Sequence, residues 1–206
     1  GYPEKLLATT RDCSHRKDRT MNPHHRDSGN QEWYTPALIV EAARLVMGTI
    51  DLDPASSPEA NRTVRAARIY TANDDGLSHP WAGRVWLNHP YGRAAGHNDR
   101  WIAYLIAEYQ AGRVSQAVAI TWASTDTAWF ARLMDYPICY TYGRPKFTQP
   151  ERMMAGAPAK TAPPKGAAIT YLGPQVARFV EVFETRSQVG RVMIPHNRVA
   201  VLGGAM

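Results

Sequence analysis

A short apolar run that ends in a polar, proline-containing loop constrains the fold of this chain more than any other feature. Residues 85–87 (Val-Trp-Leu) are followed directly by Asn88-His89-Pro90-Tyr91. A continuous apolar run bounded by breakers is typical of a strand covered on both faces, and Pro90 cannot continue a ladder because it has no N–H. Ligands bind beyond the carboxyl ends of strands in open α/β sheets, so we expect a functional site at this loop.

Strand and helix patterns alternate from residue 35 to residue 185, which predicts one α/β domain from about residue 31, with a mostly parallel sheet flanked by helices. Thr35 and Pro36 predict a helix start, as N-cap and first helical residue, and Gly48 predicts its end. A second helix should open at Pro58 and carry three arginines: Arg62, Arg65 and Arg68. The other expected elements are strands at 49–53, from 70, and at 117–122, 138–142 and 167–172, with helices at 101–109, 124–133 and 175–185. The last twenty residues give little signal.

Charge is distributed unevenly along the 206 residues, a length sufficient for one domain with a sizeable core. Residues 1–30 contain six Lys/Arg and four Asp/Glu, residues 31–139 nine and eleven, and residues 140–206 nine and three. The basic excess therefore falls in the C-terminal third, beside a slightly acidic half. A basic lobe favours a polyanionic partner, and a mildly acidic half can accept a cationic ligand, although a solvated basic surface explains the same counts.

The first thirty residues lack periodicity, so we predict a basic, mobile arm at 1–30 before a single domain at 31–206. No metal site is expected, because no Cys or carboxylate spacing complements His15, His24 and His25. Cys13 and Cys139 lie far apart, as free thiols of a reducing compartment do. No apolar run reaches the length of a membrane span, which favours a cytoplasmic protein without a membrane partner.

The loop at residues 88–91 resembles the Asn/Asp-Pro-Pro-Tyr loop of amino-group DNA methyltransferases. Further blocks occur in the order found in the phage-type DNA N6-adenine methyltransferases: residues 32–36, 51–57 with Asn61, 70–71, 75–77, Trp81, 127–130, 143–147 and 171–173. The blocks cover about residues 31–185. Several ordered blocks are far more specific than one four-residue loop.

This resemblance implies a Rossmann-like methyltransferase fold that binds S-adenosylmethionine and methylates the N6 amino group of adenine in double-stranded DNA. It implies a phage or prophage gene and the cytoplasm of a bacterial host. The catalytic residues would be Asn88, His89, Pro90 and Tyr91. The cofactor would contact Tyr34, Thr35, Pro36, Asp53, Pro54, Ala55, Asp75 and Asn88. The oligomeric state does not follow from the resemblance.

The catalytic loop fits this chemistry. An adenine amino nitrogen is a poor nucleophile because its lone pair is delocalised into the ring, and two acceptors aimed at its hydrogens would localise that pair. The candidates are Asn88 Oδ1 and the backbone carbonyl of His89. A neutral Asn acts by positioning rather than by proton abstraction. Because an amine inside a duplex is out of reach, the base must be flipped, and we expect Tyr91 to stack on it.

Two acidic residues are expected at the cofactor. Asp53 ends a strand, where a carboxylate can accept both ribose hydroxyls. Asp75 is expected to hold the adenine amine, although an Asp before Gly also forms turns. Only 22 residues separate them, and the absence of a Gly-x-Gly loop excludes a dinucleotide fingerprint. Either the first βα unit is compressed, or Asp53 serves two of the family's usual motifs. Trp33 and Trp81 can be either core residues or cofactor contacts.

Residues 148–166 contain four prolines and form the longest loop-like segment, which we expect to be a short DNA-contacting insertion. Phe147 is a candidate for the second face of the flipped base, with core packing as the alternative. The basic residues expected at DNA are Arg93, Arg144, Lys146, Arg152, Lys160 and Lys165. So short an insertion limits recognition to a few base pairs.

His89 departs from the family loop, which has Pro at this position. His keeps the carbonyl but loses the fixed φ near −65°, while Pro90 still biases His89 toward extended backbone. We therefore predict an active enzyme whose rate depends on pH between about 5.5 and 7.5 through the His89 ring. Two alternatives stay open: a catalytically degenerate DNA-binding protein on the same fold, and methylation of RNA or another amino acceptor.

Overall fold

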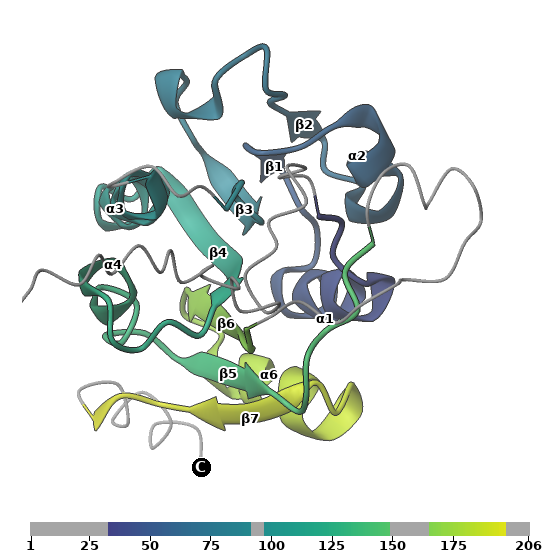
Figure 1. The fold of residues 1–206 in the computed structure, drawn as a ribbon, viewed down its shortest axis with the longest axis vertical. Helices are drawn as coiled ribbons and strands as arrows, with labels where there is room; N and C mark the ends of the chain where they lie inside the picture. Colours follow the sequence, from purple (N-terminus) through teal and green to yellow (C-terminus); the bar gives the residue numbers. More distant parts are fainter. Residues whose placement is uncertain (1–32, 92–96, 149–164, 197–206) are drawn as a thin grey trace, which may run out of the picture.

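The computed structural model describes residues 33–91, 97–148 and 165–196 (Figure 1). A seven-stranded sheet crosses these residues in the order β2-β1-β3-β4-β6-β5-β7. The strands are β1 (Leu52–Asp53), β2 (Arg68–Ile69), β3 (Gly83–Leu87), β4 (Val114–Trp122), β5 (Ile138–Thr141), β6 (Ala167–Leu172) and β7 (Gly190–Met193). The helices are α1 (Ala37–Met47), α2 (Pro58–Val64), α3 (His97–Gln110), α4 (Ala128–Ala131), α6 (Val176–Val180), the short η2 (Gly76–Ser78) and the π-helical η3 (Glu181–Arg186). The predicted N-terminal arm and most of the predicted insertion fall outside the described residues.

The sheet is mixed. β2, β1, β3 and β4 pair in parallel, whereas β4 with β6, β6 with β5 and β5 with β7 pair antiparallel. Five of the seven strands therefore share one direction, and β6 and β7 run against it. The prediction of a mostly parallel sheet is correct for strand direction, but it missed that half of the neighbouring pairs are antiparallel.

Strands β3, β4, β5 and β6 divide their side chains between two apolar layers, one on each face of the sheet. On one face, Trp86 and Ile120 pack with residues of α1 and α6. On the other face, Val85 and Leu87 pack with residues of α3 and α4 (Figure 1). All three residues of the apolar run at 85–87 are at most 1% exposed, which confirms the prediction of a strand covered on both faces.

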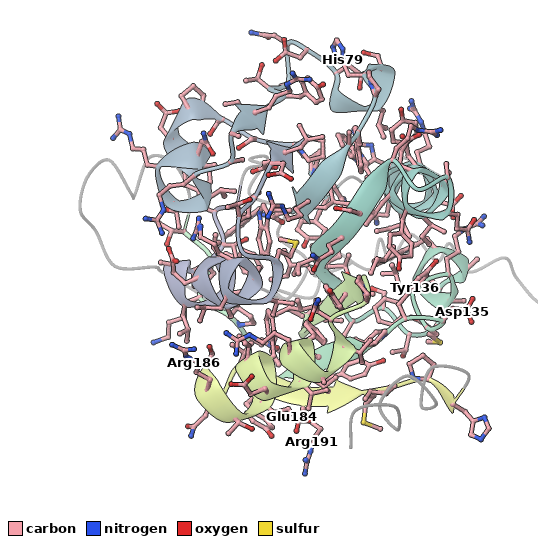
Figure 2. The ribbon with its side chains drawn as sticks, turned by 180° about the vertical axis from the view of Figure 1, so that it is seen from behind. His79, Asp135, Tyr136, Glu184, Arg186 and Arg191 are labelled. Atoms are coloured by element: carbon pink, nitrogen blue, oxygen red, sulfur yellow. The ribbon has the colours of Figure 1, made fainter. Side chains whose placement is uncertain are left out.

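Strand β7 was not predicted because only alternate residues of it are buried and the segment is short. It pairs with β5 over its whole length, and the carboxylate of Glu184 also accepts a hydrogen bond from the Val192 amide at 2.6 Å. Glu184 also lies 3.6 Å from the Arg191 guanidinium. Figure 2 shows these residues at the opposite end of the molecule from His79.

Several predicted boundaries were wrong. Helix α1 begins at Ala37 with Pro36 as its N-cap, so Thr35 does not cap it. Helix α2 ends at Val64, because Arg65 adopts a left-handed conformation with φ 51°. Arg68 therefore lies in β2 rather than on the helix, and this strand ends before Tyr70 instead of beginning there.

The remaining predicted elements are present with adjusted ends. The segment at 175–185 is helical as α6 and η3, and the helix expected at 124–133 contracts to α4. Helix α3 is longer than predicted and begins at His97. That extra turn brings His97 to the wall of the candidate site.

Candidate functional site

A cavity of about 440 Å³ opens at the carboxyl ends of β1 and β3. This volume falls in the range usual for small-molecule sites. The predicted site residues that line it are Tyr34, Thr35, Asp53, Pro54, Ala55, Asp75, Asn88, His89, Pro90 and Tyr91. Pro36 is not part of its wall. Sequence reasoning did not find four of the other lining residues: Ser57, Thr71, His97 and Trp101.

Asn88 is held in one orientation. It follows β3 directly, and its Nδ2 donates a hydrogen bond to the Trp33 carbonyl at 2.7 Å. Its Oδ1 is buried and has no hydrogen-bond partner among the described residues. Because the Trp33 carbonyl only accepts, it fixes which end of the carboxamide is the donor. The acceptor end of Asn88 is thus left for another donor.

The segment that supplies the Trp33 carbonyl is tied down on both sides. The backbones of Tyr34 and Thr148 exchange two hydrogen bonds, at 2.9 and 3.1 Å. The Tyr34 hydroxyl lies 3.1 Å from Ser57 Oγ, at the start of α2. Thr35 is buried, and its hydroxyl has no partner within the part of the chain that the structure describes.

Asp53 is a buried carboxylate at the end of β1. It is 2% exposed and accepts a hydrogen bond from the Ala55 amide at 3.2 Å. Burial raises the pKa of Asp53 to about 7, against the lowering effect of Ser56 and Ala55. A carboxyl group with this pKa changes its charge near neutral pH, which is typical of functional sites.

Asp75 lies in a tight turn and lines the same cavity as residues 88–91. It has a left-handed backbone with φ 49°, and its Oδ1 lies 3.4 Å from the Leu77 amide. The next residue, Gly76, packs so closely that a Cβ there would lie 1.9 Å from the Pro54 carbonyl oxygen. Asp75 thus forms the turn that the alternative interpretation predicted, and it also lines the cavity. Trp81 is fully buried and donates to the Gly76 carbonyl at 2.8 Å, so it belongs to the core.

The His89 ring is buried between aromatic neighbours. It is 1% exposed and lies nearly parallel to the Trp101 ring, with an interplanar angle of 11° and a centroid distance of 6.3 Å. Burial lowers the pKa of His89 to about 4. The predicted pH dependence between about 5.5 and 7.5 through His89 is therefore wrong, because the ring is already neutral throughout that range.

Tyr91 is fixed against β4. Its hydroxyl donates to the Ile120 carbonyl at 3.1 Å, and its ring stacks on Trp122 at 4.6 Å with an angle of 7°. Burial raises the pKa of the Tyr91 hydroxyl. Lys165 Nζ lies 5.0 Å from the centroid of the Trp122 ring. Trp122 was not predicted as a site residue, although it is an aromatic residue at the end of a predicted buried strand.

The residues predicted at DNA are in different environments. Arg144, Lys146 and Lys165 are exposed. Phe147 is 4% exposed and packs in the core with α1 and α6, so the core alternative is correct and the base-stacking prediction for it is wrong. Three further predicted contacts lie outside the described residues: Arg93, Arg152 and Lys160.

The described ranges, 33–91, 97–148 and 165–196, lack two kinds of feature. No group of three or more His, Cys, Asp or Glu side chains is placed there to hold a metal ion. No helix there is long and apolar enough to cross a membrane.

The fold and the site define the class of protein: an α/β domain of methyltransferase-like architecture, with a ligand cavity beyond β1 and β3 and an Asn-His-Pro-Tyr loop in its wall. The model of the DNA N-6-adenine-methyltransferase (Dam) family matches residues 22–171, and the chain belongs to this family. No curated protein and no solved structure matches the chain. The resemblance noted in the sequence is thereby confirmed.

Proposed function

We propose that this protein transfers a methyl group from S-adenosylmethionine to the N6 amino group of adenine in double-stranded DNA. Membership of the family supports DNA adenine methylation in general. The observation that carries the finer proposal is the fixed Asn88 carboxamide, with its Nδ2 on the Trp33 carbonyl and its Oδ1 buried without a partner in the described chain. A buried acceptor without a donor costs about 1–3 kcal/mol, and such groups persist where function uses them.

An adenine amino group has the donor that Asn88 Oδ1 lacks. With the His89 carbonyl as a second acceptor, the two oxygens would draw both N–H bonds out of conjugation and localise the lone pair on nitrogen. The nitrogen would then gain the methyl group as the bond from that group to the sulfonium sulfur breaks, with S-adenosylhomocysteine as the leaving group, and its extra proton would pass to solvent water. Asn88 is neutral and so is His89, because burial holds its pKa at about 4. The loop therefore acts by orientation and hydrogen bonding rather than as a general base.

The cavity fits S-adenosylmethionine. This cofactor supplies an electrophilic methyl group on a sulfonium sulfur. Asp53, ionised above about pH 7, would accept the ribose hydroxyls, and Asp75 would accept the adenine amine. The buried Thr35 hydroxyl, which has no partner in the described residues, and the adjacent Tyr34 would hold the polar methionine end. Pro36 keeps only a helix-capping role in this proposal.

Double-stranded DNA would approach on the side that carries Thr148 and Lys165, the described residues that flank positions 149–164 in the sequence. Thr148, before this segment, pairs with Tyr34 at the cavity, and Lys165, after it, lies over Trp122 beside Tyr91. The exposed Arg144 and Lys146 add positive charge to the same connection. A flipped adenine would meet the Tyr91–Trp122 pair, since aromatic faces stack on bases regardless of sequence. A phage or prophage gene and a bacterial host cytoplasm are supported by the motif resemblance alone.

The decisive experiment is incubation with radiolabelled S-adenosylmethionine and unmethylated duplex DNA, followed by nucleoside analysis. The expected product is N6-methyladenine. Parallel reactions with RNA and single-stranded DNA test the other amino acceptors. Binding of both cofactor and duplex without any methylated nucleoside would replace this proposal with the degenerate DNA-binding protein.

A further inference from the structure

The Pro90 carbonyl oxygen meets two imidazole rings. His89 Nδ1 lies 3.0 Å from it and His97 Nε2 lies 2.9 Å from it. A carbonyl oxygen only accepts, so each of these ring nitrogens must be an N–H donor. The two histidines therefore converge on one peptide group in the centre of the catalytic loop.

Helix α3 positions this pair. His97 and Trp101 are four residues apart and lie on one face of the helix, because residues at i and i+4 are neighbours there. His97 binds the Pro90 carbonyl while Trp101 faces the His89 ring. The first turns of α3 thus hold the His89–Pro90 dipeptide at two points, and both helix residues also line the cavity.

The peptide group that the two rings hold leads directly to Tyr91. Fixing the Pro90 carbonyl fixes ψ of Pro90, and so fixes the position of the Tyr91 backbone. The His89 contact also closes a small ring between its own side chain and the next carbonyl. This closure restrains the His89 backbone, as the pyrrolidine ring of a proline at the same position would do.

We infer that His97 is a positioning residue which, together with His89, clamps the Pro90 carbonyl and supplies the loop rigidity that a proline at position 89 would give. The catalytic part of this inference rests on the proposed methyltransferase function. The clamp itself makes a prediction that can be tested without measuring methylation. His89 must be the Nδ1–H tautomer and His97 must have a proton on Nε2.

The first test is the tautomeric state of the two rings, measured by long-range ¹⁵N–¹H NMR on the full chain. The expected result is a neutral His89 with its proton on Nδ1 and a His97 with a proton on Nε2. The Nε2–H tautomer for His89 would overturn the clamp. This spectrum is independent of cofactor, DNA and turnover.

The second test is a double-mutant cycle with methylation and cofactor binding as readouts. His97→Phe keeps a ring but removes the donor, and kcat should fall about 3- to 10-fold with little change in the Kd for S-adenosylmethionine. His97→Gln returns an N–H near the Nε2 position and should recover most of the loss. His89→Pro alone should retain or raise kcat, and in that background His97→Phe should have a smaller effect because the proline ring already stiffens the loop.

His79 provides the matched control. Its Nε2 lies 3.0 Å from the Asp74 carbonyl, so it makes the same kind of contact, but it is not one of the residues that line the cavity. Figure 2 shows His79 at the edge of the molecule. His79→Phe should leave kcat unchanged. An equal loss from His97→Phe in the wild-type and His89→Pro backgrounds would show a merely structural role and would overturn the inference.

The wild type could methylate no substrate while NMR still finds the expected tautomers of His89 and His97. That result would contradict the proposed function but not the clamp on the Pro90 carbonyl. Hydrogen exchange of the loop amides then tests whether the two histidines restrain the loop. His97→Phe must speed that exchange more in the wild-type background than with His89→Pro, and equal acceleration in both would overturn it.

Discussion

Asp51 directly precedes the short strand β1 and Asp53 ends it, and the two carboxylates lie in opposite environments. Asp51 accepts from the Arg84 backbone N–H and Nε at 2.9 Å each and from its Nη2 at 3.0 Å. These contacts lower the pKa of Asp51, with the Arg84 hydrogen bond as the main cause. Asp53 forms no ion pair with any of the described residues, and burial raises its pKa to about 7.

The difference separates the end of the sheet where polar groups stabilise the fold from the end where we propose that the cofactor binds. At the amino end of β1 and β3, the polar groups satisfy one another, with Thr49 adding a further donor to Asp51 at 3.0 Å. At the carboxyl end, Asp53 is buried with few donors, and the acceptor oxygen of Asn88 has no partner among the described residues. Natural proteins depart from local satisfaction mainly at functional sites, so the carboxyl end is where a ligand is expected to complete the hydrogen bonding.

The largest expected effect comes from Asn88. Asn88→Ala removes the acceptor proposed for the adenine amine, and the methylation rate should fall by about 100-fold or more, because positioning is the main contribution of this loop. Asn61→Ala is the control. Asn61 uses both ends of its carboxamide on the Ala66 backbone, so its loss should lower stability by about 1–2 kcal/mol and leave the activity of the folded fraction intact. An Asn88→Ala variant with normal kcat would remove Asn88 from the mechanism.

The second prediction compares the replacement of each aspartate by asparagine. Asp53→Asn should weaken S-adenosylmethionine binding by about 10- to 100-fold, as the loss of a charged acceptor does. Asp51→Asn should leave that affinity unchanged and lower the free energy of unfolding by about 1 kcal/mol, since its ion pair with Arg84 is one-third exposed on both sides. Calorimetric titration and urea unfolding of both variants measure the two effects. Equal cofactor affinities in the two variants would show that Asp53 contributes no more to cofactor binding than Asp51 does.

The contrast between the two ends of the sheet also explains which features of the fold and the site could be predicted from the sequence. The strand at 85–87, the loop after it and Asp53 at a strand end follow from local patterns of apolar residues and proline. The bond from Asn88 to Trp33 spans 55 positions and the stack of Tyr91 on Trp122 spans 31, so both depend on how strands are ordered in the sheet. The pH role of His89 was predicted wrongly because burial, which no local pattern reveals, determines its pKa.

The third prediction concerns the basic residues near the carboxyl end of the sheet. Replacing Arg144, Lys146 and Lys165 with Gln should reduce the slope of log K for duplex DNA against log salt by about 2 to 3, because each phosphate contact contributes about 0.9. Cofactor binding without DNA should be unchanged. Replacing three exposed arginines elsewhere, Arg62, Arg132 and Arg186, provides a control of equal charge. The same slope in both triple variants would move the DNA surface away from this connection.

The smallest expected effect in the wild type is the pH dependence of stability, because two buried groups oppose each other. Asp53 has a pKa of about 7 in the folded protein and near 3.8 when unfolded, so the folded state binds more protons and stability falls as pH rises through this window. His89 has a folded pKa of about 4 and an unfolded value near 6.5, so stability rises with pH between these values. The two slopes largely cancel between about pH 4 and 6.5.

Urea unfolding at several pH values should therefore give a nearly level profile of stability against pH in the wild type, a rising profile in Asp53→Asn and a falling profile in His89→Pro. If neither substitution changes the dependence of stability on pH, then burial does not shift the pKa of Asp53 or of His89.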